Sequence, residues 1–364
     1  MDDRTAAALL TDRSGILTSV VRSTAWPLDG GIVALGWGIV GIGRIADTQM
    51  APAISALGPG SLVAVVSRDQ GRSEAFAERH GARRAYTSYE QLLGDSEVDV
   101  VLVATPNSLH SDQVVLAAQA GKHVLCDKPL AVSVAAARRA VSACEAAGIS
   151  LGINFQTRHH PCFEEVKRLL EGGAIGQPLL IQVQASVSIA ALSGWRADTG
   201  LAGLGAIYNI GVHAYDLLRY LTSAEVRSVT AMFEVGAARQ LERLAMVILE
   251  FDNGVRAYVT ANQYVPGYPN RFEAFGSEGS IRVTDMPRLW VRGRLELTRV
   301  RGNRVIDYQG IGDNLAYRRA VVDFDESART GKPARATGLD GVRSAELSDA
   351  IARSVHQGMT VTLT

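Results

Sequence analysis

Two stretches of the sequence carry side chains that could exchange a proton with an alcohol. In the first, a lysine follows a short apolar run in Cys126-Asp127-Lys128-Pro129-Leu130. Beside a positive charge the pKa of this lysine would be depressed. Its neutral amine could then accept a proton from a hydroxyl or, in reverse, protonate an alkoxide. An isolated lysine is more often a solvated surface charge, but the position of Lys128 at the end of a predicted strand (123–126) favours a catalytic role.

The second stretch is a predicted helix over residues 205–221. Its Asn209 and His213 are four residues apart and therefore share one face, and Asp216 lies close to that face. His213 could hydrogen-bond the reacting hydroxyl, while Asn209 could hold that hydroxyl or the lysine in place. The alternative is an amide and an imidazole that satisfy each other in the core.

A glycine turn indicates the cofactor that would accompany these groups. The apolar run 32–40 leads into Gly41-Ile42-Gly43-Arg44-Ile45-Ala46, and a helical pattern continues to residue 57. Gly41 permits a sharp turn, Gly43 lets a pyrophosphate approach the backbone, and Ala46 lets the helix pack near the strand. Because free N–H groups at a helix N-terminus attract anions, we predict a dinucleotide held by residues 41 and 43–46. A plain strand–helix turn is the alternative.

The end of the second strand (62–67) bears on which nicotinamide cofactor is bound. An acid usually receives the free ribose 2′-hydroxyl of NAD at this place. Here the strand ends in Ser67-Arg68-Asp69, so a hydroxyl and a guanidinium come first. Arginine binds phosphate through paired N–H donors, and we therefore predict NADP, bound through Ser67 and Arg68. NAD stays possible, since Asp69 could still reach a ribose.

Polar residues also follow the other predicted strands. Ligands bind outside the carboxyl ends of strands in an open α/β sheet, so these residues should gather around the nicotinamide and its ribose. Trp195 and Arg196 in a later loop are plausible as a wall over the same ring. The further residues predicted to contact the cofactor are Thr105, Pro106, Asn107, His110, Asp127, Lys128, Gln156, Trp195 and Arg196.

Residues 32–154 alternate predicted strands (32–40, 62–67, 84–86, 98–104, 123–126, 149–154) with helices, which predicts a parallel, doubly wound α/β sheet. Residues 155–364 predict an α+β domain with an open, mostly antiparallel sheet. Its expected strands are 179–189, 226–235, 244–251, 255–263, 271–275, 280–283, 289–291 and 295–300, with a type I′ turn at Asp252-Asn253-Gly254. Residues 1–31 are either a real arm or, as we favour, an extension without ordered structure or role.

The composition gives no indication of a nucleic-acid-binding, membrane or metal-binding protein. The 364 residues carry 37 basic and 37 acidic side chains, which gives no reason to expect a nucleic acid or a membrane surface as partner. Three scattered cysteines lack metal-ligand spacing, so we expect no metal site and a reducing, cytoplasmic location. No apolar run reaches the roughly 18 residues of a bilayer span.

Five segments in order resemble the glucose–fructose oxidoreductase/inositol dehydrogenase/MocA family of NAD(P)-dependent oxidoreductases. They are Gly-Ile-Val-Gly-Ile-Gly-Arg-Ile-Ala (38–46), Ala-Thr-Pro-Asn-Ser-Leu-His (104–110), Asp-Lys-Pro (127–129), Trp-Arg-Ala-Asp (195–198) and Gly-Ala-Ile-Tyr-Asn-Ile-Gly-Val-His-Ala-Tyr-Asp-Leu-Leu (205–218). The resemblance implies a Rossmann domain, sugar, cyclitol or related polyol substrates, and dimers or tetramers formed through the open sheet. It makes Lys128 the catalytic lysine and His213 the catalytic histidine.

Two positions depart from the family pattern. Asp127 replaces a glutamate, which preserves its polar character, and Asn209 stands where many members have an aspartate. An amide cannot carry a proton as a carboxylate can, so His213 or water would have to carry it. Hydride transfer between NAD(P) and a secondary alcohol is the favoured function. A glycosidase that retains NAD through a redox cycle and a non-catalytic NAD(P)-binding sugar sensor are the alternatives.

Overall fold

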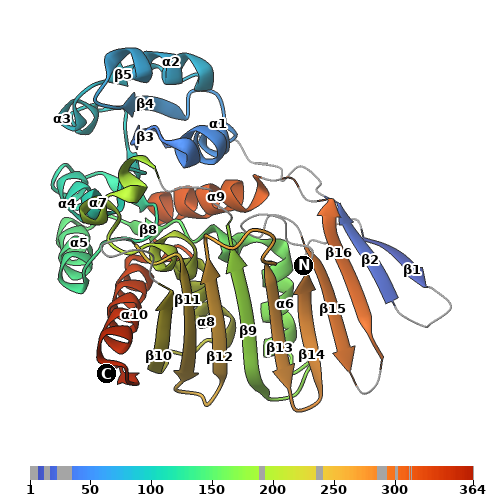
Figure 1. Ribbon diagram of the computed structural model, residues 1–364. Coiled ribbons are helices and arrows are strands. Elements are labelled where there is room, and N and C mark those ends of the chain that lie inside the picture. The colour runs from blue at the N-terminus through green and yellow to red at the C-terminus, as the bar shows by residue number, and fades with distance from the viewer. Residues whose placement is uncertain are drawn as a thin grey trace.

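The computed structural model describes residues 7–11, 17–22, 35–187, 193–234, 241–284, 293–299, 302–310, 312 and 314–363. These residues form two sheets, which Figure 1 shows one above the other with α9 (Leu315–Thr330) between them. The upper sheet belongs to the N-terminal part of the chain, and the lower, larger sheet belongs mostly to the C-terminal part.

The smaller sheet is parallel throughout and has the strand order β5-β4-β3-β6-β7-β8. This order confirms the predicted doubly wound Rossmann architecture. The chain starts in the middle at β3, moves to one side, and crosses over to β6, so the switch point lies between β3 and β6. The strands are β3 (Trp37–Val40), β4 (Leu62–Val66), β5 (Arg84–Tyr86), β6 (Val100–Val103), β7 (His123–Cys126) and β8 (Leu151–Ile153).

Helical segments connect these strands. Those of the N-terminal part are η1 (Ala46–Met50), α1 (Ala51–Ser55), α2 (Gln70–His80), α3 (Tyr89–Leu93), η2 (Asn107–Leu109), α4 (His110–Gln119) and α5 (Val134–Ala147). The Ser133 side chain caps the first turn of α5, and Gly148 ends this helix in the left-handed conformation. The first helix differs: it is π-helical over η1, one turn before Pro52, which has no N–H to donate to an α-helical ladder.

Within the described residues, the larger sheet has eleven strands in the order β1-β2-β16-β15-β14-β13-β9-β12-β11-β10-β17. Only the β9–β12 and β2–β16 pairs are parallel, which confirms the predicted mostly antiparallel sheet. Its strands are β1 (Ala7–Thr11), β2 (Leu17–Arg22), β9 (Pro178–Ser186), β10 (Val226–Glu234), β11 (Leu244–Phe251), β12 (Arg256–Asn262), β13 (Arg271–Gly276), β14 (Gly279–Thr284), β15 (Arg294–Arg299), β16 (Arg304–Gly310) and β17 (Val361–Thr362).

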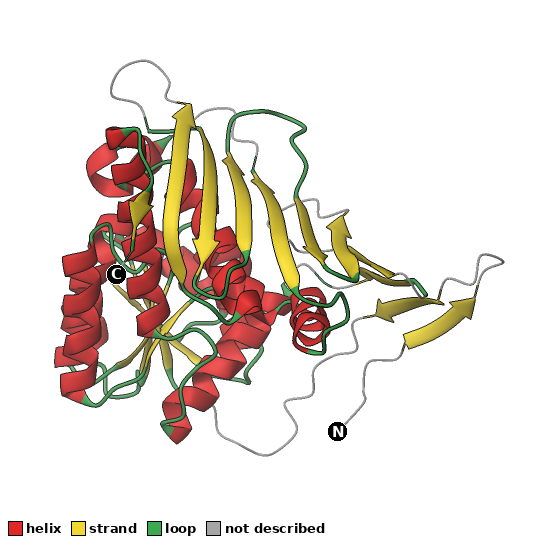
Figure 2. Ribbon diagram, turned by 90° about the horizontal axis from the view of Figure 1, so that it is seen from below, coloured by secondary structure: helices red, strands yellow, loops and turns green. Residues whose placement is uncertain are grey.

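Helices lie along one side of the large sheet, as Figure 2 shows. The helical segments of the C-terminal part are η3 (Gln156–His159), α6 (Pro161–Glu171), η4 (Gly194–Ala197), α7 (Thr199–Ala202), η5 (Ile207–Gly211), α8 (Val212–Thr222), α9 and α10 (Gly338–Gln357). None of the helices in the described part of the chain combines the length and the apolar character that a bilayer span requires.

Three expectations differ from the structure. The β11–β12 hairpin forms, but its turn is not type I′: Gly254 has a φ of 85°, whereas Asn253 is not among the residues with positive φ. A type I′ turn needs positive φ at both central residues. Strands β16 and β17 were not predicted, and residues 7–11 and 17–22 pair as a hairpin beside β16 rather than lacking structure. The predicted strand 289–291 lies outside the described residues.

A helix from the end of the chain ties the two parts together. Phe324 of α9 packs edge-on against Trp37 of β3, with 6.0 Å between ring centroids, and both side chains are buried. The indole Nε1 of Trp37 donates to the Asp325 carboxylate at 3.1 Å. A Cβ at Gly152 in β8 would lie 2.5 Å from the Phe324 ring. The C-terminal part therefore supplies one covering helix of the N-terminal sheet, which fixes the edge where the two parts meet.

Candidate active site

The glycine turn leads from β3 toward a pocket between the two parts of the chain. Gly41 has a φ of 91°, and a Cβ there would lie 2.6 Å from the main chain of Ala104, so the turn requires glycine. A Cβ at Gly43 would meet nothing within 4 Å, and Gly43 lines the pocket together with Arg44 and Ile45. This open backbone beside the switch point suits an approaching phosphate.

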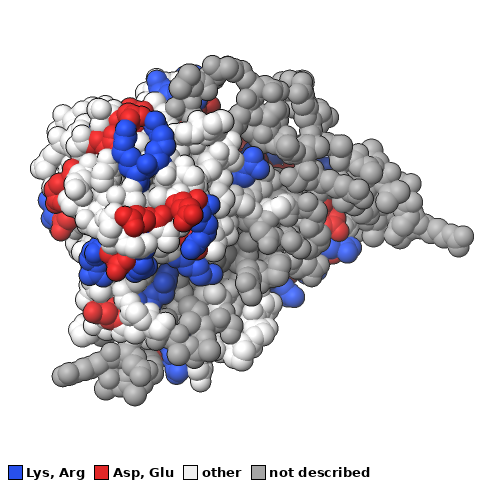
Figure 3. Space-filling model, turned by 90° about the horizontal axis from the view of Figure 1, so that it is seen from above, with Lys and Arg blue, Asp and Glu red and all other residues white. Residues whose placement is uncertain are grey.

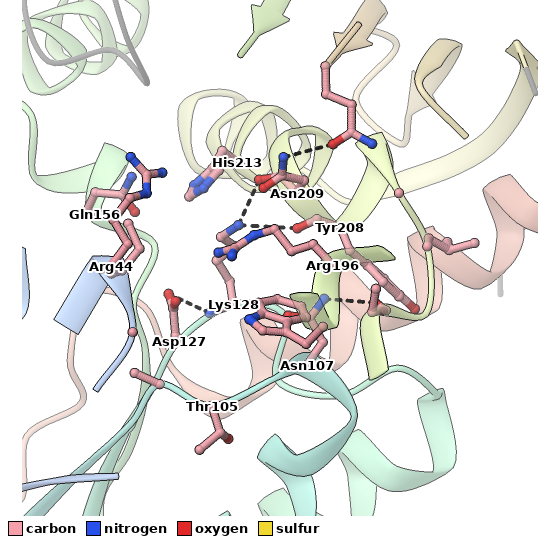
Figure 4. A pocket seen from close by; sticks show the side chains of 18 of the residues that line it. Arg44, Thr105, Asn107, Asp127, Lys128, Gln156, Arg196, Tyr208, Asn209 and His213 are labelled. Atoms are coloured by element: carbon pink, nitrogen blue, oxygen red, sulfur yellow. Dashed lines mark hydrogen bonds between the residues drawn. The ribbon is translucent and has the colours of Figure 1, made fainter. Parts of the chain in front are cut away.

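Lys128 occupies the centre of the pocket and joins the two parts. It stands two residues after β7, and its Nζ donates to the main-chain oxygen of Asn209 at 2.8 Å and of Tyr208 at 3.3 Å (Figure 4). Both carbonyls belong to η5. Because that segment is π-helical, the Val212 N–H reaches back five residues to Ile207 rather than four to Tyr208. The Tyr208 carbonyl is thereby left to accept from the lysine.

The electrostatic surroundings of Lys128 favour its neutral form. Its pKa falls from the ordinary 10.5 to about 8, mainly because the amine is buried; the negative charge of Asp127 opposes this shift, and the positive charge of Arg196 adds to it. A lysine with such a pKa can both accept and release a proton near neutral pH.

His213 and Asn209 lie in the same pocket as the Lys128 amine (Figure 4). Burial holds the pKa of His213 well below its ordinary value, and the positive charge of Lys128 adds to this effect. The imidazole is therefore neutral at neutral pH, with one donor and one acceptor nitrogen. Its Nδ1 is buried and has no hydrogen-bond partner among the described residues. The prediction that these three side chains meet in one cleft agrees with their placement.

Two arginines from different parts of the chain give the pocket a positive wall. Arg44 follows the glycine turn, while Arg196 comes from η4 and lies over the Trp195 ring at 4.4 Å. Burial lowers the pKa of Arg196, and repulsion from Arg44 lowers it further. Two guanidinium groups that repel each other across a cavity would be stabilised by an anion between them, such as the pyrophosphate of a dinucleotide.

Asp127 is the acidic side chain of this wall. Its Oδ1 accepts from the Lys128 main-chain N–H at 3.0 Å and from Asn154 Nδ2 at 3.4 Å, so the carboxylate is held against the main chain.

Within the described ranges, His, Cys, Asp and Glu side chains do not form a group of three that could hold a metal ion.

The pocket contains most of the predicted residues and several that were not predicted. The residues that line it are Gly43, Arg44, Ile45, Ala104, Thr105, Asn107, Asp127, Lys128, Gln156, Trp195, Arg196, Ala202, Leu204, Gly205, Tyr208, Asn209, His213, Gln263 and Tyr317. Tyr208 could have been found from its place beside Asn209. Gln263 and Tyr317 could not, because β12 and α9 bring them in from positions far along the chain.

Six predicted cofactor residues do not line the pocket: Gly41, Ala46, Ser67, Arg68, Pro106 and His110. His110 is buried, and its Nδ1 lies 2.7 Å from the Pro129 oxygen and its Nε2 2.8 Å from the Thr105 oxygen. It therefore ties the loop after β6 to the loop after β7. Ala46, the first residue of η1, is fully buried, which fits the packing role inferred for it.

The side chains that follow β4 bear on the choice between NAD and NADP. Asp69 caps α2, since its Oδ1 accepts from the Arg72 N–H at 2.8 Å. The Ser67 hydroxyl donates to the Asp69 main-chain oxygen at 2.9 Å and lies 2.9 Å from the Ser73 hydroxyl. Arg68 is exposed, and no hydrogen bond or ion pair of its side chain is found within the described part of the chain. Among these groups the guanidinium is the one open to a ligand.

Asp216 does not face the pocket. Its carboxylate forms two hydrogen bonds with the buried Arg158, at 2.8 Å to Nε and 2.6 Å to Nη2. Arg158 Nη2 also donates to Asp340 at 2.8 Å, and its Nη1 donates to the Arg335 main chain at 2.7 Å. This network joins η3, α8 and α10 beneath the site, so the residues after β8 support the pocket rather than opening into it, Gln156 excepted.

Comparison with known proteins agrees with this arrangement. A family model described as an oxidoreductase family with an NAD-binding Rossmann fold matches residues 35–155, and the GFO/IDH/MocA C-terminal domain matches residues 163–282. The chain belongs to the Gfo/Idh/MocA family of oxidoreductases. It is thus an enzyme of the dehydrogenase and reductase class, as the motifs predicted.

Three relatives of this family member are informative. 1,5-Anhydro-D-fructose reductase of Ensifer adhaerens is 32% identical over 88% of this chain and 96% of its own length. Levoglucosan dehydrogenase with NADH and levoglucosan is 25% identical, with a TM-score of 0.81 over 90% of this chain and 99% of its own. The 3-ketoreductase KijD10 of Actinomadura kijaniata with NADP is 26% identical, with a TM-score of 0.80 over 89% and 98%. Structural relatives therefore bind either nicotinamide cofactor.

We predict that Asp216 matters for stability and not for catalysis. Asp216→Asn leaves the buried Arg158 without its paired carboxylate, which should lower the free energy of unfolding by about 3 kcal/mol. Urea denaturation measures this loss. Asp112→Asn removes an exposed pair with Arg139 and should cost less than about 1 kcal/mol. The folded Asp216→Asn enzyme should keep the native kcat; a large loss of kcat in the folded variant would contradict the structural role.

Proposed function

We propose that this oxidoreductase transfers hydride reversibly between a nicotinamide cofactor and a secondary alcohol or ketone of a sugar, cyclitol or related polyol. The observation that carries the proposal is the Lys128 amine, which has a pKa of about 8 and lies in one pocket with His213 and Asn209. A secondary alcohol needs a base for its hydroxyl proton as its carbon loses hydride. The polar lining suits a substrate with several hydroxyl groups.

Each side chain has a distinct part in the proposed reaction. In oxidation the neutral Lys128 amine takes the hydroxyl proton, and in reduction the ammonium returns it to the alkoxide. The nicotinamide, when bound, accepts or supplies the hydride. Neutral His213 hydrogen-bonds the reacting oxygen, and Asn209 orients the hydroxyl or the lysine. Since an amide does not ionise, proton exchange with solvent would run through Lys128, His213 or water.

The residues around the glycine turn fit a dinucleotide. The backbone at Gly43 is open, and Arg44 and Arg196 can place positive charge on either side of a pyrophosphate. Thr105, Asn107, Asp127 and Gln156 would hold the nicotinamide ribose and amide. We propose NADP as the cofactor, because Asp69 is engaged in capping α2 while Arg68 is free to bind a 2′-phosphate.

We predict that Lys128→Met lowers kcat/KM by about a thousandfold while the Kd for NADPH stays close to native. A screen of sugars and cyclitols that follows reduced nicotinamide identifies a substrate, and NADPH fluorescence gives the Kd.

The pH dependence of the native enzyme is a further test. Oxidation needs the neutral amine, so its kcat/KM should rise with pH and level off above about 8. Reduction needs the ammonium and should weaken above that pH.

The control is Lys332→Met, which removes an exposed ammonium outside the pocket. Normal turnover by Lys128→Met would show that the base has been misassigned. Release of sugar hydrolysis products without net reduction of a retained cofactor would favour the glycosidase alternative, and cofactor and sugar binding without any turnover would favour the sensor.

The cofactor proposal has its own test. Arg68→Ala should raise the Kd for NADPH at least about tenfold through the loss of a charge-assisted contact, and should leave the Kd for NADH nearly unchanged. Fluorescence titration measures both constants. Arg227→Ala, an exposed arginine of β10, serves as the charge-matched control. An equal loss for both cofactors would remove the argument for NADP.

We propose that the face of the large sheet opposite its helices forms a homodimer or homotetramer. Support comes from an apolar cluster on that face, defined here as Met232, Met246, Ile248 and Tyr258. The register pairs Met232 with Met246 and Ile248 with Tyr258, and Met232 and Ile248 are 65% and 54% exposed. Large exposed apolar side chains gathered on one surface are typical of an interface. Acidic and basic side chains instead lie next to one another on the face shown in Figure 3.

Ile248→Glu tests this interface. A carboxylate in the middle of the apolar cluster should shift the protein to monomer in sedimentation velocity, because burial of an unpaired charge is costly. Leu339→Glu, at an exposed leucine of α10, should keep the native assembly. A native protein that sediments as a monomer, or an unchanged Ile248→Glu oligomer, would contradict the proposal.

We also propose a cytoplasmic location, in keeping with three free, buried cysteines.

A further inference from the structure

Gln263 lies behind Asn209 and has a fixed place at the wall of the pocket. It follows the last residue of β12, it is 3% exposed, and its main-chain N–H donates to the Arg243 oxygen at 2.9 Å. Its side chain makes two hydrogen bonds. Nε2 donates to the main-chain oxygen of Glu242 at 3.1 Å. Oε1 accepts from Asn209 Nδ2 at 2.9 Å, a bond drawn as a dashed line from the labelled Asn209 in Figure 4.

These two bonds determine which way both amides point. A main-chain carbonyl can only accept, so Gln263 must present its NH2 group to Glu242. Its oxygen must then face Asn209, and Asn209 must in turn present its own NH2 group to Gln263. The remaining half of the Asn209 amide, the Oδ1 atom, is left for the pocket that Asn209 lines. Because the Glu242 carbonyl can only accept a hydrogen bond, Asn209 presents an acceptor and not a donor to a ligand in the pocket.

The carbonyl that anchors this chain of bonds is itself held firmly. The Glu242 oxygen also accepts from the Ala206 N–H at 2.8 Å, and Glu242 Oε1 accepts from the Ile207 N–H at 3.0 Å. A Cβ at Gly205 would lie 2.1 Å from the same oxygen, so the backbones approach as closely as glycine allows. Glu242 is therefore fixed to the start of η5, the segment that carries Asn209.

We propose that Gln263 is a positioning residue that holds Asn209 as a hydrogen-bond acceptor toward a second hydroxyl of the substrate, next to the reacting one. The inference rests on the proposed hydride transfer at this site. With Oδ1 turned inward, Asn209 can accept the O–H of that second hydroxyl and so orient the substrate, which leaves the proton of the reacting hydroxyl to the Lys128 amine. If the amide were reversed, its NH2 group would compete with that O–H and with the Lys128 ammonium.

A double-mutant cycle tests whether Gln263 acts through Asn209. Gln263→Met keeps the volume and removes both hydrogen bonds, so kcat/KM should fall about tenfold, as expected for one misdirected hydrogen bond. The Kd for NADPH should stay native. In the Asn209→Ala background, Gln263→Met should cause no further loss. Multiplication of the two losses would overturn the proposal, since it would mean an independent structural effect. Gln119→Met, at an exposed glutamine of α4, is the control.

A second variant gives a signature in the pH profile. In Gln263→Glu the neutral carboxylic acid can still donate to the Glu242 oxygen and accept from Asn209, whereas the carboxylate has no donor and is repelled by that oxygen. The variant should approach native kcat/KM at low pH and lose activity through one added ionisation as pH rises. A profile parallel to that of the native enzyme would overturn the positioning role.

A spectroscopic measurement separates this inference from the proposed function. In protein labelled with 15N-asparagine, the Asn209 side-chain signal is identified by its loss in Asn209→Ala. That signal should shift in Gln263→Met and stay in place in Gln119→Met. If the shift is seen while no polyol is turned over, the amide arrangement holds and the proposed reaction fails. An unmoved signal would overturn the arrangement itself, whatever the activity.

Discussion

The contact between the Lys128 ammonium and the carbonyls of η5 is the constraint on which the site depends. It joins a residue at the carboxyl end of a Rossmann strand to a segment of the C-terminal part of the chain. The same contact removes the amine from water, and that burial is the main reason for its lowered pKa. A small relative movement of the two parts would return the lysine to solvent and restore its ordinary pKa.

The rest of the fold acts to prevent such a movement. The Trp37 indole N–H donates to Asp325 of α9, so a hydrogen bond attaches the C-terminal part to β3 of the N-terminal sheet. Beneath the pocket, Arg158 binds carboxylates from α8 and α10. A buried ion pair adds little net stability compared with apolar packing, but it strongly penalises any arrangement that separates its members. Both contacts therefore favour one relative placement of Lys128 and η5.

Local sequence signals predicted the parts of the fold that depend on neighbouring residues. Ser133 and Gly148 fix the two ends of α5, and the glycine turn follows from the sterics of Gly41. Features that depend on distant residues were not predictable in the same way. The π-helical winding of η5 cannot be read from the pattern of apolar residues, although it frees the Tyr208 carbonyl, one of the two that accept from Lys128. His110 was expected near the cofactor because it follows a strand end, yet the Pro129 carbonyl, nineteen residues away, draws it into the core.

The candidate site likewise contains residues that local sequence signals predicted and residues that only the folded chain brings together. Lys128, Asn209 and His213 were expected together, because strand ends converge and helix positions four apart share a face. Gln263 and Tyr317 could be placed only once the folded chain brought β12 and α9 to the pocket. Asp216 was ambiguous for a physical reason: position on a helix face does not tell whether a carboxylate faces a cleft or a buried arginine.

The neutral amide at position 209 also has an electrostatic consequence for the lysine. A carboxylate at that place would lie close to the Lys128 amine and raise its pKa, because an opposite charge stabilises the ammonium. An amide oxygen attracts the ammonium far less, so burial and Arg196 can dominate the balance against Asp127. The pocket thereby keeps a predominance of positive charge, which suits the phosphates of a dinucleotide, and still allows its lysine to be neutral when a hydroxyl proton must be taken. Asn209 is thus better matched to this pocket than an acid would be, provided that its oxygen is turned toward the substrate.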